Sequence, residues 1–346
     1  MVFYIQFVLN NYLPNKKSNS KIHPSVMIDF IKIKITDEAL INEVWNNNLL
    51  VYEGKSEKRF DDELKELITK SYKNLYFTKF NNRLEIKGSL HYYFNVGIHN
   101  ADDFYIADCI DTIIEIETIF NLDLNKCYLI NLEYGVNINP KILVSDLILN
   151  IIYHEKRPFN RPKNFNYKIA GNEAYKQIKA YDKSVQFPNL CNNTFRFEVK
   201  SKQAKFIQSL GLFTLQHLTE FKYYNTLIKS LLNEWDNVLL FDKSKVIDDK
   251  FFNTNFWDDI LQNGNRNKFN NQKKLYNKKL GTDNLHTNIK KIIERKTKYL
   301  KCVHIPTTIN LETAQLKIQF VSTYTKYSPP FYKSVNDFRY SSHTYK

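Results

Sequence analysis

The sequence predicts an α+β fold, with strands and helices mixed in residues 27–210 and a mostly helical, basic region in residues 211–346. Three observations support this. Several segments before about residue 203 alternate apolar and polar residues with the two-residue period of a strand. The segments after it have helical spacing instead. The chain of 346 residues, 43% of them hydrophobic, is also long enough for one large domain or two ordinary ones with a substantial core.

The chain is expected to enter its fold at Met27. The preceding segment NKKSNSKIHPS is polar and linker-like, so residues 1–26 are predicted to be an extension outside the fold. MIDFIKIKIT (residues 27–36) alternates cleanly and predicts a strand. TDEALINEVWNNNLL (36–50) then predicts a helix with Thr36 as its N-cap and acidic residues in its first turn.

The middle of the chain alternates between strands and helices. Strand patterns occupy LYFTKF, RLEIKGSLHYYFN, KCYLINLEYGVNIN, YKQIKAYDKSVQF and NTFRFEVKSK. Helical spacing predicts a helix over DCIDTIIEIETIF (108–120) and another over PKILVSDLILNIIYH (140–154), which has a proline in its first turn. From about residue 203 the chain is helical, and residues 263–301 are rich in lysine and asparagine.

The net charge of +14 points to an anionic partner, with nucleic acid as the first candidate. The alternative is compositional, because the chain is heavy in Lys, Asn, Ile, Phe and Tyr, the residues of AT-rich codons. Within the basic tail, Lys273, Lys274, Lys278 and Lys279 are candidate DNA-binding residues. The plainer alternative for them is a solvated charged surface.

Three classes of protein are disfavoured by what the sequence lacks. The four cysteines have no paired spacing, which predicts neither a zinc site nor a disulfide framework and fits a reducing cytoplasm. No segment approaches the ~18 apolar residues of a membrane span, so we expect a soluble protein without a membrane partner. The GxxxxGK[ST] phosphate-binding pattern does not occur, so ATP use within this chain is not expected.

Carboxylates on strands are the first candidates for chemistry. Glu133, Asp182 and Glu198 all lie in strand patterns, and carboxylates that converge across a sheet can hold Mg²⁺ or Mn²⁺, because hard cations prefer oxygen ligands. The alternative is that each carboxylate faces solvent on the polar side of its strand. His99 follows Gly97 in an expected turn and is a candidate for a functional loop, whereas His91 has a weaker claim.

Tyr181 is the candidate nucleophile. The segment IKAYDKS places it between Lys179 and Lys183 on one face of the predicted strand, and flanking cations stabilise a phenolate. Tyrosine is the usual nucleophile when an enzyme cuts a DNA strand and keeps hold of the end. Tyrosine is also simply a good strand former, and Tyr175, in the same alternation phase, is a competing nucleophile. The segment HEKR is similar to the His-x-x-Arg of tyrosine recombinases, but Tyr181 follows it too closely for that chemistry.

The order of these motifs resembles that of the replication initiators of filamentous phages, of the gene II and gene X type, and more distantly that of plasmid rolling-circle initiators. The segments that carry the resemblance are MIDFIKIKI, LEIKGSLHYYFNVGIHNADDF, INLEYGVNI, IKAYDKS and TFRFEVKSKQAKFIQSLGLFTLQHL, and they cover residues 27 to about 240. The sequence departs from the family pattern at three positions: Glu133 stands where aspartate is frequent, Asn131 replaces an arginine, and Ser184 replaces a glycine. A His-hydrophobe-His metal motif is also absent from the sequence.

The resemblance implies an antiparallel-sheet, nicking-endonuclease-like domain in residues 27–210, followed by a helical basic DNA-binding region in residues 211–346. Carried over to this sequence, Tyr181 is the nucleophile and Lys183 its cationic helper. The candidate ligands of a Mg²⁺ or Mn²⁺ ion are Glu133 and Glu198, with His99 as a third, and Lys179 is expected to contact DNA.

The function that this resemblance implies is rolling-circle initiation in the cytoplasm of a bacterial host cell. The protein would bind origin DNA in double- and single-stranded form, nick one strand through a 5′-phosphotyrosine, and rejoin the ends after one round. A host helicase and a host polymerase are its expected partners. Two alternatives remain open: a conjugative relaxase with the same chemistry, and a DNA-binding replication or control protein that does not cut DNA.

Overall fold

The computed structural model describes residues 27–60, 63–160, 167–172, 175–264 and 266–298, all of which belong to one compact unit. The extension expected in residues 1–26 and the end of the basic region, residues 299–346, lie outside the described residues. Within the described part, helices and an antiparallel sheet are mixed along the chain, so the expected α+β class is confirmed. Among the described residues, no helix is both long enough and apolar enough to cross a membrane.

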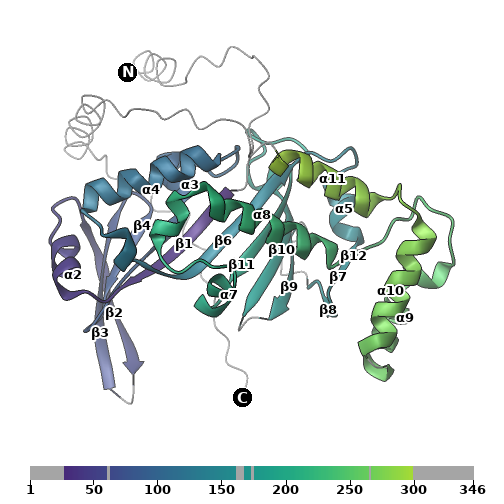
Figure 1. Ribbon diagram of the computed structural model, residues 1–346, viewed down its shortest axis with the longest axis horizontal. Helices are drawn as coiled ribbons and strands as arrows, with labels where there is room; N and C mark the ends of the chain where they lie inside the picture. The colour runs from purple at the N-terminus through teal and green to yellow at the C-terminus, as the bar shows by residue number, and fades with distance from the viewer. Residues whose placement is uncertain (1–26, 61–62, 161–166, 173–174, 265, 299–346) are drawn as a thin grey trace, which may run out of the picture. The chain divides into compact units, whose positions relative to one another are not determined.

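The main sheet has nine antiparallel strands in the order β2-β3-β4-β5-β1-β6-β11-β10-β9 (Figure 1). Its strands are β1 (Met27–Ile35), β2 (Val51–Phe60), β3 (Glu63–Tyr72), β4 (Leu75–Lys79), β5 (Leu84–Ser89), β6 (Tyr128–Ile138), β9 (Tyr167–Asn172), β10 (Lys176–Asp182) and β11 (Phe195–Ser201). A smaller sheet has the order β12-β7-β8 and consists of β7 (Ile151–His154), β8 (Arg157–Pro158) and β12 (Val238–Leu240).

Helices lie between the strands and dominate the chain after residue 203. The α-helices are α2 (Glu38–Trp45), α3 (Leu90–Phe94), α4 (Ile106–Phe120), α5 (Val144–Asn150), α6 (Lys183–Gln186), α7 (Ala204–Ser209), α8 (Phe221–Asp236), α9 (Thr254–Asn263), α10 (Arg266–Leu280) and α11 (Leu285–Lys298). In the part of the chain that the structure describes, three short 3-10 helices are η1 (Leu124–Lys126), η2 (Leu215–Thr219) and η3 (Asp249–Phe252).

One face of the sheet forms the main core with helices α4, α8 and α11 (Figure 1). On β11, Phe195, Phe197 and Val199 are fully buried on this side, and Trp235 of α8 packs edge-on against both phenylalanine rings. Because side chains alternate along a strand, the residues between them project from the opposite face. That opposite face carries the charged residues described below.

The region after residue 210 shares this core with the sheet. Leu231 of α8 and Ile293 of α11 are fully buried in the main hydrophobic cluster, and β12 pairs with β7. Helices α9 and α10 pack around a second cluster that includes Trp257 and Tyr276. The division of the chain by role at residue 210, into catalytic and DNA-binding parts, stays a prediction.

Several element boundaries differ from the sequence expectations, and side-chain caps explain three of these differences. Helix α2 is capped by Asp37, whose carboxylate accepts from the Leu40 amide at 2.9 Å, rather than by Thr36. The strand expected over residues 83–95 ends at Ser89, which caps α3. The strand expected over residues 175–187 ends at Asp182, which caps α6.

Another difference concerns the helix expected over residues 140–154. The helix there is short: α5 covers residues 144–150, and the chain then forms β7. Pro140 therefore precedes the helix instead of occupying its first turn. The apolar run IIYH was ambiguous because a short apolar segment fits a buried strand as well as a helix, and pairing of β7 with β12 decides the outcome.

Candidate active site

The register of the central strands gathers charged side chains on the face opposite the core. Tyr181 of β10 lies opposite Arg196 of β11, and Lys179 lies opposite Glu198. Directly opposed residues in an antiparallel pair project from the same face of the sheet. Tyr181 and Lys179 therefore share a face with Arg196 and Glu198, as the alternation of IKAYDKS predicts for the first two.

Strand β6 adds the third row of this face. Glu133 lies opposite Lys200, and Gly135 lies opposite Glu198. A Cβ atom on Gly135 would come within 2.5 Å of the Phe197 carbonyl oxygen and 2.6 Å of the Glu198 Cγ. Glycine at this position therefore makes room for the buried Glu198 side chain beside Glu133.

A third carboxylate, Asp29, reaches the same face through a β-bulge in β1. Strict alternation would place Asp29 with Ile31 and Ile33 in the core. The pairing of β1 with β6 instead shifts register between Ile28 and Phe30, so that Ile28 and Ile31 are both buried in the core while Asp29 is not among its residues. Bulges re-aim side chains in this way. Sequence reasoning missed Asp29. The signal was its position in the same two-residue period as Ile31 and Ile33, because a carboxylate is out of place among residues of the core.

Asp29, Glu133 and Glu198 form a three-carboxylate group, which we call the carboxylate cluster. One carboxylate oxygen from each lies within 4.8 Å of the other two. Their side chains are 13%, 6% and 1% exposed, respectively. A set of oxygen donors at this spacing fits a hard divalent cation such as Mg²⁺ or Mn²⁺. The residues present therefore fit the metal that the family resemblance implies, with Asp29 as a candidate ligand in addition to Glu133 and Glu198.

Basic side chains of the chain itself neutralise the carboxylate cluster. Glu133 pairs with Lys179 and Lys200 through its two oxygens. Arg196 lies with its Nε 2.5 Å from Glu198 Oε1 and its Nη2 3.4 Å from Asp29 Oδ1. Burial raises the pKa of Glu133, but the charges of the two lysines outweigh burial and hold that pKa below its usual range.

The pKa of Asp29 follows the same balance. Burial raises it, and the charges of Arg196 and Lys183 and a hydrogen bond from Asn100 outweigh burial, so the pKa lies well below its usual range. Asp29 and Glu133 are therefore ionised at neutral pH and available as anionic ligands.

Tyr181 stands at the edge of the carboxylate cluster. Its Oη donates a hydrogen bond of 3.1 Å to Glu198 Oε1, and the residue is 9% exposed. Lys183 begins helix α6 rather than continuing β10, because Asp182 caps that helix. Its ammonium nonetheless lies 5.6 Å from the centre of the Tyr181 ring and donates to Asn100 Oδ1 at 2.6 Å. Burial and the charge of Arg196 lower the pKa of Lys183 to about 7.

The structure places the two candidate histidines outside the carboxylate cluster. His99 lies with its Nδ1 3.2 Å from Asn95 Nδ2 and 3.6 Å from Asp102 Oδ1. His91 is buried, lies 2.7 Å from Asp102 Oδ1, and stacks on Phe104. Burial lowers the pKa of His91. The geometry therefore does not bring His99 together with Glu133 and Glu198. Its role as a metal ligand stays a prediction.

The other candidate residues lie elsewhere. Asp182 caps α6 and is not part of the carboxylate cluster. Tyr175 precedes β10 and packs edge-on against Phe206, with 5.4 Å between ring centres. Among the basic residues of α10, Lys274 and Lys278 are exposed. Two others are engaged in contacts: Lys273 donates to the Asp236 carbonyl at 3.1 Å, and Lys279 pairs with Asp248 at 3.2 Å.

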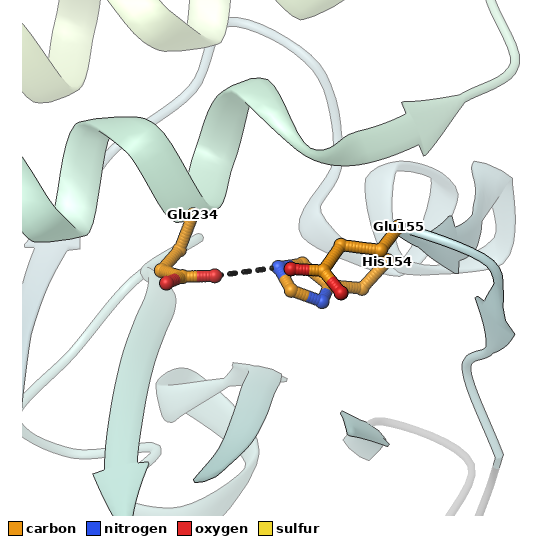
Figure 2. Close-up of side chains that lie close together, drawn as sticks. All are labelled: His154, Glu155 and Glu234. Carbon is orange, nitrogen blue, oxygen red and sulfur yellow. Dashed lines mark ion pairs between the residues drawn. The ribbon is translucent and has the colours of Figure 1, made fainter. Parts of the chain in front are cut away.

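A second group, His154, Glu155 and Glu234, also has ligand atoms within 4.8 Å of one another (Figure 2). His154 Nε2 lies 2.9 Å from Glu234 Oε2, and both residues are buried. The ammonium of Lys176 lies 2.6 Å from Glu234 and 3.5 Å from Glu155. Burial raises the pKa of Glu234, but the hydrogen bonds and charges of His154 and Lys176 outweigh burial and lower that pKa. We interpret this group as an ion-pair network that joins β7 to α8.

The fold and this site define an α+β protein whose antiparallel sheet carries a tyrosine beside three carboxylates on one face. No protein-family model matches the chain, and no curated protein matches it. A solved structure of the rolling circle replication initiator protein from Geobacillus stearothermophilus aligns with a TM-score of 0.41 and 10% sequence identity, over 69% of this chain and 96% of that chain.

Proposed function

We propose that this chain is a rolling-circle DNA replication initiator that nicks and rejoins one DNA strand through Tyr181. The observation that carries the proposal is the hydrogen bond from the Tyr181 phenol to Glu198, a member of the carboxylate cluster. A tyrosine beside hard-cation ligands is an arrangement that suits metal-assisted phosphoryl transfer to a phenol. The motif order in residues 27 to about 240 and the charge of +14 support the same function.

The cutting step is a transesterification. The Tyr181 Oη attacks the scissile phosphorus, a bond from phosphorus to the phenol oxygen forms, and the bond to the 3′ oxygen breaks. The proton of the phenol passes to the Glu198 carboxylate that accepts its hydrogen bond, and the departing 3′ oxygen takes up a proton from solvent. The product is a 5′-phosphotyrosine with a free 3′-OH, and the reverse reaction rejoins the strand.

Other residues of the site would support this step. Asp29, Glu133 and Glu198 would hold a Mg²⁺ or Mn²⁺ ion, which when bound neutralises charge on the phosphate. The ammonium of Lys183 lies 5.6 Å from the Tyr181 ring centre, and in its protonated form it would favour the phenolate of Tyr181. Arg196 is fully buried and holds both Asp29 and Glu198, so its role is to position those carboxylates.

The proposal extends to partners and to the organisation of the chain. Residues 27–210 would carry the nicking chemistry, and residues 211–346 would bind origin duplex through exposed lysines such as Lys274 and Lys278. The protein would bind single-stranded DNA at Tyr181. A host helicase and a host polymerase would act after the nick, in the cytoplasm of a bacterial cell.

The second candidate is a DNA-binding replication or control protein that does not cut DNA. The observation that favours it is the pairing of every member of the carboxylate cluster with lysine or arginine, which is also how a purely structural charge network is neutralised. A relaxase at a transfer origin would use the same residues as the initiator.

A covalent adduct separates the two candidates that cut DNA from the one that does not. The purified full-length chain is incubated with Mg²⁺ or Mn²⁺ and labelled single-stranded oligonucleotides that tile the replicon encoding it. We expect one oligonucleotide to yield a protein–DNA adduct that survives denaturation. If every oligonucleotide binds without an adduct under either metal, the non-cutting candidate is the better one.

A further inference from the structure

Lys179 spans three strands on the charged face. The backbone of Lys179 lies on β10 opposite Glu198 of β11. Its ammonium extends to Glu133 of β6 and donates a hydrogen bond to Oε2. The same ammonium lies 3.7 Å from Glu198 Oε2. Lys179 thus places a buried positive charge between two carboxylates of the cluster, and its own exposure is 9%.

The remaining oxygens of these two glutamates have other partners. Glu133 Oε1 pairs with Lys200. Glu198 Oε1 pairs with Arg196 and also accepts the hydrogen bond of the Tyr181 phenol. The Oε2 atoms of Glu133 and Glu198 both lie beside the ammonium of Lys179. A divalent ion that uses them must compete with the ammonium of Lys179 for the same place.

We propose that Lys179 is a built-in cation that occupies the metal position of the metal-free chain and is released from it when Mg²⁺ or Mn²⁺ binds. This inference rests on the proposed function for its metal. A flexible four-carbon stem allows the ammonium to leave. After its release, the ammonium of Lys179 stays on the face that carries Tyr181, where it positions the scissile phosphate. This positive charge is therefore available to DNA only when the metal is bound.

Metal affinity tests this inference without DNA or cleavage. The full-length wild-type chain and the variants Lys179→Met and Lys200→Met are titrated with Mn²⁺ by calorimetry. Lys200→Met is the matched control, because Lys200 pairs with the other oxygen of Glu133. We expect Lys179→Met to bind Mn²⁺ on the order of tenfold more tightly than wild type, since a charge-assisted contact no longer competes. Lys200→Met should gain severalfold less.

A second measurement uses the wild-type chain and therefore does not depend on the stability of a variant. Lysines are acetylated briefly with and without Mn²⁺, and the modified positions are read by mass spectrometry. We expect Lys179 to be protected without Mn²⁺ and labelled with it. Lys168, which is also buried and donates to the Leu149 and Ile151 carbonyls, should stay protected in both conditions.

Three outcomes overturn the inference: Lys179→Met binds Mn²⁺ no more tightly than Lys200→Met, Lys179 stays protected when Mn²⁺ is bound, or neither the wild-type chain nor Lys179→Met binds Mn²⁺. Failure of the proposed function is distinguishable from these. If Mn²⁺ releases Lys179 but no oligonucleotide forms an adduct, the inference stands and strand cutting does not.

Discussion

The Tyr181 phenol donates a 3.1 Å hydrogen bond to Glu198, which lies on the neighbouring strand two residues beyond the direct cross-strand partner of Tyr181. This diagonal contact joins the candidate nucleophile to the carboxylate cluster. It also means that one residue, Glu198, contacts the phenol, faces Lys179 and pairs with Arg196. Substitutions at and around Glu198 can therefore separate the chemical roles of this site from its structural ones.

Replacing Tyr181 by Phe should abolish the covalent adduct and leave non-covalent DNA binding, which phosphate contacts elsewhere supply. The free energy of unfolding should fall by no more than about 1 kcal/mol, since one hydrogen bond is lost and Glu198 keeps Arg196. Denaturing gels measure the adduct and urea titration measures stability. Tyr175→Phe is the control, because Tyr175 packs against Phe206 away from the cluster. An adduct that persists in Tyr181→Phe and vanishes in Tyr175→Phe would move the nucleophile.

Replacing Asp29 by Asn should weaken Mn²⁺ binding on the order of tenfold or more, because it removes one anionic ligand of the carboxylate cluster. Calorimetry measures the change. Asp182→Asn and His99→Ala should bind Mn²⁺ as the wild type does, since Asp182 caps α6 and His99 faces Asn95 and Asp102. The opposite result, with His99→Ala weakened and Asp29→Asn unchanged, would restore the ligand set expected from the sequence.

Replacing Gly135 by Ala should disturb the position of Glu198, because the new Cβ would lie 2.6 Å from its Cγ and 2.5 Å from the Phe197 carbonyl oxygen. We expect a loss of about 1–3 kcal/mol in unfolding free energy and a weaker affinity for Mn²⁺. Gly88→Ala is matched, since its Cβ would lie 2.5 Å from the Asn74 carbonyl oxygen, outside the cluster. It should lose comparable stability and keep its Mn²⁺ affinity. Equal Mn²⁺ affinities of the two variants would show that Gly135 is not needed to position Glu198 for the metal.

Lys183 should make the stability of the metal-free chain depend on pH. Its pKa is lowered from 10.5 to about 7 by burial and by Arg196, so between these values the unfolded chain binds more protons at this residue than the folded chain. The cost of burying the charge is full below pH 7 and is relieved as the pH rises toward 10. Urea titrations in EDTA should therefore show the stability of wild type rising relative to Lys183→Met from pH 7 to pH 9.5. A constant difference would mean that Lys183 stays charged when buried.

Two exposed lysines of α10, Lys274 and Lys278, should contribute to the salt dependence of duplex DNA binding. Each phosphate contact adds a slope of about −0.9 to a plot of log affinity against log salt. The double variant with Gln at both positions should flatten the slope by up to about 1.8, as measured by fluorescence anisotropy. Lys273→Gln should change it less, because Lys273 donates to the Asp236 carbonyl. An unchanged slope in the double variant would indicate a solvated charged surface that does not contact DNA.

The strands that carry most of the site can be predicted from the periodicity of the sequence alone. The two-residue period of FRFEVKS places Phe195, Phe197 and Val199 in the core, and this leaves Glu198 on the opposite face, where the structure has it. The same reasoning holds for Lys179 and Tyr181 on β10. Period and burial are local properties, because an apolar side chain on a strand must find a core whichever strand lies next to it.

The periodicity does not predict which of these strands are neighbours or where their regularity breaks, because both depend on tertiary contacts. The order β1-β6-β11-β10 brings Glu133 beside Glu198, and the bulge at Asp29 turns a residue from the core phase of β1 into the carboxylate cluster. The cap formed by Asp182 takes Lys183 off the strand, and the loop after α3 keeps His99 with Asp102. Strand order, bulges and caps depend on contacts between residues far apart in the chain or on competition between side-chain and ladder hydrogen bonds, and a periodic pattern records neither.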